Sequence, residues 1–366
     1  MMPSTAARSL PPAARYGRPV LLGAAAVLVA AFAGAAPARA AGTTTCTVNG
    51  TAQSATAANN FTITAPSGRN NDIECPQGIG AGDTVQGGSG GENFIGTNTL
   101  DGTITSLGTN DTVFIQVGVS ATGVVNLGAG TVNFELDGSN NGTIVSTASG
   151  IHSVSLLTRD GSNAGLIDLR QAARSTATVT GQRPNTPTGT IRGSGTDSTV
   201  NLKPARRLVA VVPHPGNEGT ISTLAGLTSH VEVTGGYGTT PGAGNTGVIE
   251  TGSGPSTVSV TGGYQLLTGR GAAGNTGRIT IGQGAPTVTV TGGAGTLALG
   301  GDGNASGGTI TGGPADDTFN LNGGFRQTFL GSGNTGNAGT VDGGGGTNEC
   351  DIRPAGTGTV TNCTVS

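Results

Sequence analysis

Eight basic residues of this 366-residue chain lie between positions 159 and 207, where only Asp160, Asp168 and Asp197 oppose them. The stretch therefore carries a local net charge of +5 within a chain whose net charge is −3. Clustered guanidinium groups attract polyanions, so the stretch predicts binding of an acidic polysaccharide or a cell-wall polymer. A solvated surface that favours arginine is the alternative. The candidate binding residues are Arg159, Arg170, Arg174, Arg192, Arg206 and Arg207.

Other kinds of chemistry find less support in the sequence. Nucleic acid is a poor ligand because the arginines lack aromatic partners for stacking on bases. His152, His214 and His230 fall in different repeats, and none has metal-ligand spacing to another. A lyase would need a base beside charge-neutralising groups. The concentrated candidates are Arg159, Asp160, Asp168, Arg170 and Arg192, for which salt bridges are the better explanation. The sequence thus favours a non-enzymatic protein with no catalytic residues and no cofactor.

Calcium binding is the one metal chemistry that a motif indicates. Residues 312–319 resemble a degenerate Gly-Gly-x-Gly-x-Asp calcium repeat, and residues 87–94 are a second loose match. Calcium arrays repeat this phrase every nine residues and stack their carboxylates around the ion. Each copy here stands alone, so no metal site is predicted, and Asp316 and Asp317 are the residues to test for calcium.

The four cysteines lie near the two ends of the chain, outside the repeats described below. An even number of cysteines in an exported chain indicates disulfides, and four allow three pairings. We favour Cys46–Cys75 and Cys350–Cys363, because stacked repeats spaced by about 4.8 Å would hold the two ends far apart. Both bridges would then stabilise the end caps, where a stack exposes open strand edges.

A repeated phrase, Gly-x-Ile or Gly-x-Val, sets the architecture that must position these residues. It recurs at steps of 19 to 31 residues, a period typical of stacked solenoids. The ten copies begin at Gly102, Gly123, Gly142, Gly165, Gly189, Gly219, Gly247, Gly277, Gly308 and Gly339. We expect each copy to open one coil of the solenoid.

Alternating side chains predict the strands of each coil. Val258 and Val260 alternate with polar residues and should face inward, and Val258 stands eleven residues after Gly247. The same offset recurs in other coils, so these side chains should form columns. A third short strand is expected near Gln265, followed by a loop that absorbs the unequal repeat lengths.

Two further rows of side chains are expected at the corners between strands. Asparagine stands two residues before the glycine in several copies, where tolerance of positive φ would suit a corner and stacked amides would form a structural ladder. These asparagines are Asn140, Asn163, Asn217, Asn245, Asn275 and Asn337. Tyr237, Tyr264 and Phe325 each follow a Gly-Gly pair, which predicts a short aromatic ladder, with a sugar-binding platform as the alternative.

The repeat style resembles that of right-handed parallel β-helix proteins over roughly residues 80–346. The Asn-x-Gly-x-Ile/Val phrase in particular is similar to those of secreted bacterial surface proteins such as autotransporter passengers and haemagglutinin-like adhesins. The resemblance implies a scaffold or adhesin, although some proteins of this fold are polysaccharide lyases or hydrolases. Because a fold alone does not determine function, both possibilities stay open.

The N-terminal residues predict export. Arg8, Arg15 and Arg18 precede an apolar run at residues 20–34, and Ala38-Arg39-Ala40 is a small-x-small cleavage site. We therefore divide the chain into a signal peptide (1–40), an N-terminal cap (41–95), β-helix repeats (96–346) and a C-terminal cap (347–366). With 70 glycines and 3% aromatic residues, one large globular core is implausible.

The predicted fold is all-β, a right-handed single-stranded parallel β-helix of about ten coils with disulfide-stapled caps. The predicted function is that of a secreted, glycine-rich scaffold or adhesin, at or near the cell surface, with no membrane span in the mature chain. The competing hypothesis is a carbohydrate-active protein that uses the arginine-rich stretch at 159–207. The oligomeric state stays open.

Overall fold

The computed structural model describes residues 44–157, 161–204, 214–224, 226–266, 269–295, 299–325 and 334–366. The chain divides into two units, Met1–Ala38 and Arg39–Ser366, and all described residues belong to the second. The predicted signal peptide thus lies outside the described residues. No helix in the described ranges is both long enough and apolar enough to cross a membrane.

Two long sheets build the second unit, and the chain alternates between them. The larger, sheet A, has 18 strands. Most of them form one parallel ladder, in which each strand pairs with the corresponding strand of the following coil. This ladder consists of β4 (Asn71–Cys75), β6 (Asn93–Leu100), β8 (Asn110–Val119), β10 (Gly130–Leu136), β13 (Gly150–Leu157), β16 (Arg174–Gly181), β19 (Asp197–Pro204), β21 (Thr228–Thr234), β23 (Ser256–Thr261), β25 (Thr287–Thr291), β27 (Thr318–Asn322), β29 (Glu349–Arg353) and β31 (Thr364–Val365).

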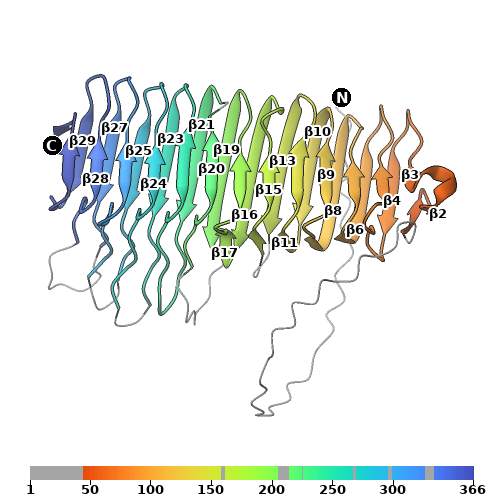
Figure 1. The fold of residues 1–366 in the computed structure, drawn as a ribbon, viewed down its shortest axis with the longest axis horizontal. Coiled ribbons are helices and arrows are strands. Elements are labelled where there is room, and N and C mark those ends of the chain that lie inside the picture. Colours follow the sequence, from red (N-terminus) through yellow and green to blue (C-terminus); the bar gives the residue numbers. More distant parts are fainter. Residues whose placement is uncertain are drawn as a thin grey trace, which may run out of the picture. The chain divides into compact units, whose positions relative to one another are not determined.

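Sheet B has 13 strands, all parallel. They are β3 (Thr62–Thr64), β5 (Thr84–Gln86), β7 (Thr103–Thr105), β9 (Val124–Leu127), β12 (Thr143–Ser146), β15 (Leu166–Asp168), β18 (Thr190–Arg192), β20 (Thr220–Thr223), β22 (Val248–Thr251), β24 (Arg278–Thr280), β26 (Thr309–Thr311), β28 (Thr340–Asp342) and β30 (Thr359–Thr361). Each coil gives one strand to each sheet, and successive coils follow one another in sequence order (Figure 1).

This arrangement is a β-solenoid, as the repeats predicted. Ten strands of sheet B follow the ten copies of the glycine phrase, and β3, β5 and β30 extend the stack beyond them. The predicted count of about ten coils came from those ten copies. Because β3 and β5 lack the phrase, the sequence repeat does not mark the first coils.

Aliphatic columns fill the interior. Ile249, Ile279 and Ile310 are direct partners in sheet B, and all three are fully buried. In sheet A, Val258 pairs with Val288, which pairs with Phe319, as the eleven-residue offset predicted. Each fully buried aliphatic side chain contributes about 1.5–3 kcal/mol, so the columns are the main stabilising term of the stack.

The glycine of the repeated phrase is required by close approach between coils. A Cβ added to Gly247 would lie 2.1 Å from the carbonyl oxygen of Gly219, and one on Gly277 would lie 2.2 Å from that of Gly247. Neither glycine has positive φ. These glycines are therefore needed because they lack a side chain, which allows the backbones of successive coils to come into contact. Tolerance of positive φ, which we expected at the corner, is not the reason for glycine here.

A third, narrow side carries the predicted asparagine ladder, which begins at Asn140 and replaces the aliphatic residues Ile79, Leu100 and Val119 of the first coils. It consists of β11 (Ser139–Asn140), β14 (Ser162–Asn163) and β17 (Arg183–Asn185), followed by isolated bridges between asparagines. Each Nδ2 donates to the Oδ1 of the asparagine in the next coil at 2.7–2.9 Å. The row runs through Asn140, Asn163, Asn185, Asn217, Asn245, Asn275, Asn304 and Asn337.

Two features of these corners differ from expectation. The ladder includes Asn185 and Asn304, which stand four residues before their glycines instead of two. None of its asparagines is among the described residues with positive φ. The reason for asparagine at these positions is therefore the hydrogen bonds of its side chain, and not a left-handed backbone. The expected third strand near Gln265 is reduced to single bridges from Gln265 to Gly238 and Gly295, and residues 267–268 and 296–298 lie outside the described ranges.

Both ends are closed by the predicted disulfides. At the N-terminal end, β1 (Thr45–Val48) and β2 (Thr51–Ser54) form an antiparallel hairpin beside β4, followed by the 3₁₀ helix η1 (Ala57–Asn59). Cys46–Cys75 joins β1 to β4, and Cys350–Cys363 joins β29 to the turn before β31. The hairpin pairs with the first strand of the main ladder in sheet A, a common way of protecting a sheet edge.

Candidate functional site

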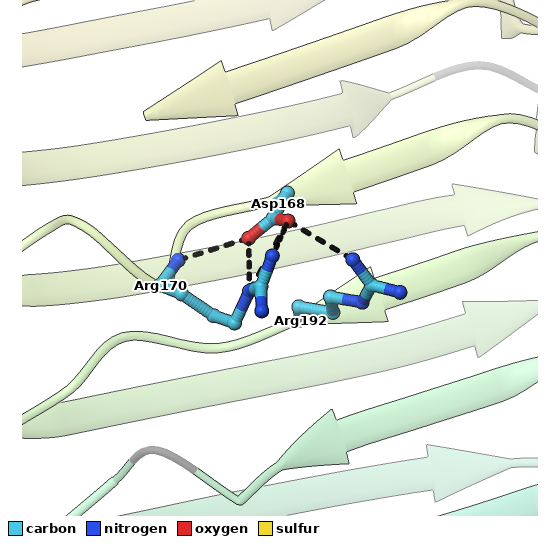
Figure 2. A network of polar contacts seen from close by, with 3 residues as sticks. All are labelled: Asp168, Arg170 and Arg192. Carbon is cyan, nitrogen blue, oxygen red and sulfur yellow. Dashed lines mark hydrogen bonds and ion pairs between the residues drawn. The ribbon is translucent and has the colours of Figure 1, made fainter. Parts of the chain in front are cut away.

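Among the described residues, the most concentrated charged cluster lies on the outer face of sheet B, around Asp168. Asp168 ends β15, Arg192 ends β18, and the two residues are direct partners in the sheet. Arg170 follows Asp168 by two residues and turns back toward it. Figure 2 shows both guanidinium groups converging on one carboxylate. Parallel pairing thus brings together two of the predicted binding residues from neighbouring coils.

Hydrogen bonds hold this cluster in a fixed arrangement. The Nε of Arg170 donates to Oδ1 of Asp168 at 2.9 Å, and Nη2 donates to Oδ2 at 2.7 Å. The backbone N–H of Arg170 adds a bond to Oδ1 at 3.2 Å, and Nη1 of Arg192 donates to Oδ2 at 3.2 Å. The fork of Arg170 is bidentate, which is the strongest common geometry for an arginine–carboxylate pair.

These bonds determine the acidity of Asp168. Burial by itself would raise the pKa of this carboxyl, but hydrogen bonds from the side chain and backbone of Arg170, and from Arg192, lower the pKa below its ordinary value. The carboxylate therefore stays ionised at neutral pH. A general base needs a pKa near the working pH, so Asp168 is poorly suited to accept a proton from a substrate.

A surface groove of about 570 Å³ adjoins the cluster. Its lining combines two guanidinium groups, three hydroxyls, one carboxylate and one aliphatic side chain. The residues are Arg170, Thr190, Arg192, Thr220, Ser222, Leu224 and Glu250. Glu250 is held by Nη2 of Arg278 at 2.8 Å. Since a guanidinium has five N–H donors, Arg192 retains donors beyond its bond to Asp168. The groove can accommodate an anionic group flanked by hydroxyls.

The other basic residues of the 159–207 stretch that the structure describes do not line this groove. Arg174 pairs with Asp197 on sheet A at 3.2 Å, and Lys203 pairs with Glu232 at 3.2 Å. Arg183, on β17, forms an ion pair with Glu218. The described members of the stretch thus lie on different sides of the coils, and each has an acidic partner. Arg159, Arg206 and Arg207 lie outside the described residues.

Two of these acidic partners were not anticipated from the sequence. Glu218 and Glu232 follow the basic stretch along the chain, but each belongs to the next coil and reaches back to its partner. The described cations Arg170, Arg174, Arg183, Arg192 and Lys203 face Asp168, Asp197, Glu218 and Glu232. Five positive charges and four negative ones leave little excess charge at these positions.

The histidines are separated, as their spacing predicted. His152 is buried in the interior, where Nε2 bonds to the carbonyl of Gly128 at 2.9 Å. Burial lowers the pKa of His152, and the bond to Gly128 opposes this effect in part. His230 is exposed on the outside of sheet A. His214 lies elsewhere, and its backbone carbonyl accepts a hydrogen bond from the N–H of Gly236. Within the described ranges, no three His, Cys, Asp or Glu residues are placed to hold a metal ion.

The residues proposed for a calcium test have local structural partners. Oδ1 of Asp316 accepts the backbone N–H of Thr347 at 2.6 Å, and Oδ2 of Asp317 accepts that of Gly313 at 2.8 Å. Asp317 is buried, whereas Asp316 is exposed. Burial, with a smaller contribution from the charge of Asp316, raises the pKa of Asp317 to about 6 although the N–H of Gly313 opposes the shift. Asp316 and Asp317 remain the residues to test for calcium.

The predicted aromatic ladder is a single pair. The rings of Tyr237 and Tyr264 lie 5.3 Å apart between centroids, tilted by 33°. The next coil has Ala294 at this position, which interrupts the row before Phe325. Phe325 is 74% exposed.

Comparisons of the chain with protein-family models, with curated proteins and with solved structures found no match. The role of the charged groove must therefore be argued from its own geometry.

Proposed function

We propose that this protein is an extracellular β-solenoid scaffold or adhesin without catalytic activity. The observation that carries this proposal is the state of Asp168. The carboxylate in the most concentrated charged cluster is held by two arginines with a lowered pKa, so its chemistry is that of a structural ion pair. The surrounding aliphatic columns and asparagine ladder suit a rigid support.

Export and display at the cell surface are part of the same proposal. The sequence of residues 1–40 has the features of a signal peptide, and two disulfides are compatible with an oxidising compartment. The repeat style is similar to that of secreted bacterial adhesins. Fractionation of producing cells should find the protein in the medium or on intact cells, and retention in the cytoplasm would refute this part of the proposal.

The absence of catalysis is tested with acidic polysaccharides. The purified protein is incubated with pectate, alginate, hyaluronan and teichoic acid, and ultraviolet absorbance is followed for unsaturated products of lyase cleavage. Reducing-end release measures hydrolysis in parallel. We expect no protein-dependent signal in either assay, and cleavage of any of these polymers would rule out the scaffold function.

A second candidate function is binding of an acidic polysaccharide, and the groove beside Asp168 favours it. Two guanidiniums and three hydroxyls could bind a uronate carboxylate and its neighbouring hydroxyls. The test variant is Arg170→Ala/Arg192→Ala with Asp168→Asn added, so that no carboxylate is left partly buried without a partner. Arg174→Ala is the matched control, because Arg174 is similarly exposed on another face. Binding that survives the triple substitution would exclude this groove.

A further inference from the structure

The outer face of sheet A carries two outward-facing aromatic side chains on neighbouring strands. Phe94 on β6 is 41% exposed, and Phe114 on β8 is partly exposed, whereas Ile95 and Ile115 beside them point inward and are buried. On most other coils the outward positions of this sheet are threonine, serine, asparagine or charged residues. Hydrophobic burial in the solenoid therefore does not account for the two rings.

A hollow on this face is lined by both rings and by a glycine. Gly96 lies in the middle of β6, directly between Glu74 on β4 and Phe114 on β8. The Cε1 atom of Phe94 is 3.2 Å from the position of a Cβ on Gly96, so this ring forms one wall. The hollow has a volume of about 370 Å³. Glycine costs about 0.5–1 kcal/mol inside a strand, and the close approach of the Phe94 ring accounts for it here.

The remaining walls are polar and one of them is anionic. Glu74, Asn98 and Gln116 line the hollow beside the two rings. Asp72 is the direct partner of Phe94 on the neighbouring strand. Between residues 70 and 158 the chain has no Lys or Arg, but it has eight acidic residues: Asp72, Glu74, Asp83, Glu92, Asp101, Asp111, Glu135 and Asp137. The hollow thus lies in a region of negative potential.

These features select among ligand classes. An anionic group would meet the carboxylate of Glu74, and no Lys or Arg is among the described residues that line the hollow. A neutral sugar could stack on the rings but would make no use of the charge. An organic ammonium group interacts with both the rings and the carboxylate of Glu74, since a positive charge is attracted to the faces of aromatic rings and to a carboxylate. Its methyl or methylene groups also suit an apolar wall.

We infer that the hollow formed by Glu74, Phe94, Gly96 and Phe114 binds an organic ammonium group, of the kind that quaternary ammonium compounds carry. The ammonium group lies between the two rings, with the carboxylate of Glu74 as its counter-ion. The amides of Asn98 and Gln116 offer hydrogen bonds to a hydroxyl on the same ligand. This inference goes beyond the scaffold function and does not depend on it.

The decisive experiment compares two ligands that differ in charge and hardly in shape. Choline and its carbon isostere 3,3-dimethylbutan-1-ol are titrated separately into the purified protein, and amide NMR shifts of Gly96 and Phe114 are followed. We expect saturable shifts with choline and at least fivefold weaker binding of the isostere. No saturable shift, or equal affinity for both ligands, would overturn the inference. Saturation of the same amides by methyl glucoside, with none by choline, would also overturn it and identify a sugar site.

Substitutions then separate ligand binding from a structural role for the rings, because an aromatic side chain over a strand glycine can also stabilise a sheet. Glu74→Gln alters an exposed side chain, so it should leave the unfolding midpoint unchanged and weaken choline binding about fivefold. Glu349→Gln, on the same sheet at the far end of the stack, is the matched control and should bind as the unmodified protein does. Unchanged choline affinity in Glu74→Gln would contradict the proposal.

The aromatic walls are tested by Phe94→Leu and Phe114→Leu, each expected to weaken choline binding about two- to fivefold. If either protein unfolds, Glu74→Gln still decides the question, because no buried atom changes in that variant.

Discussion

Replacing one interior asparagine of the ladder should destabilise the stack more than replacing a terminal one. Asn245 is fully buried, its Oδ1 accepts Nδ2 of Asn217 at 2.8 Å, and its Nδ2 donates to Oδ1 of Asn275 at 2.8 Å. Asn245→Ala removes both bonds and leaves a donor of one neighbour and an acceptor of the other without their main partner.

The expected magnitude follows from the number of buried groups affected. A buried polar group that loses its partner costs about 1–3 kcal/mol. The orphaned groups have weaker alternatives, because Nδ2 of Asn217 also reaches the carbonyl of Gly219 at 3.3 Å and Oδ1 of Asn275 accepts the N–H of Gly277 at 3.2 Å. We therefore expect Asn245→Ala to lower the free energy of unfolding by about 2–4 kcal/mol.

Two control variants make the prediction specific. Asn140 begins the described ladder and makes one inter-asparagine bond, to Asn163, so Asn140→Ala should cost about half as much. Asn320 faces outward on β27 and lies outside the ladder, so Asn320→Ala should stay within about 0.5 kcal/mol of the unmodified protein. The order of the three losses is as diagnostic as their size.

Urea unfolding followed by circular dichroism gives the three midpoints. Because stacked arrays can open locally, hydrogen exchange at the amides of Thr246 and Gly247, which donate to the carbonyl of Asn217, checks that the loss begins in the altered coil. A loss for Asn245→Ala no larger than that for Asn320→Ala would refute the view that the amide ladder stabilises the fold.

Three other perturbations have defined outcomes. Gly247→Ala should lower the free energy of unfolding by about 2–3 kcal/mol, measured by urea midpoint, because the new Cβ would meet the carbonyl of Gly219; Gly50→Ala, with positive φ but open space, should cost about 1 kcal/mol. The folded-state pKa of Asp317, about 6, exceeds the ordinary 3.8, so its stabilising contribution is fully present below the ordinary pKa and is lost as the pH rises through about 6. Asp317→Asn should therefore show a smaller loss of stability than the unmodified protein between about pH 4 and pH 7, and parallel pH profiles would contradict this assignment. The double substitution Cys350→Ser/Cys363→Ser removes a disulfide of sequence separation 13 and should lower the free energy of unfolding by about 3 kcal/mol. Hydrogen exchange should become faster at Thr359–Thr361 and stay unchanged at Ile249.

Part of the candidate site could be predicted, and part could not. The sequence identified Arg170 and Arg192 as candidate binding residues and favoured salt bridges as the explanation of their clustering with Asp168. Asp168 and Arg192 each stand three residues after a glycine phrase, at Gly165 and Gly189, so parallel pairing brings these two together. It did not identify Glu218 and Glu232 as the partners of Arg183 and Lys203. Arg183 and Glu218 are separated by 35 residues, and their contact depends on how much of that length forms a loop.

The hollow lined by Phe94 and Phe114 could not be predicted from the sequence either, because its residues come from different coils. Glu74, Gly96 and Phe114 come from three coils of unequal length, with an irregular register between Thr97 and Thr99. Even the composition of the amide ladder required coordinates, because Asn185 and Asn304 stand two residues farther from their glycines than the other members that we identified.

The sequence alone determined the architecture, because the two signals that specify it are local. Alternation of apolar and polar residues marks each strand, and the recurring glycine phrase marks each return of the chain to sheet B. The terminal cysteines could likewise be paired by distance along the stack. Only the tertiary structure decided which surface residues meet, because those contacts join neighbouring coils, and their register is set by loops whose lengths vary without a repeating pattern.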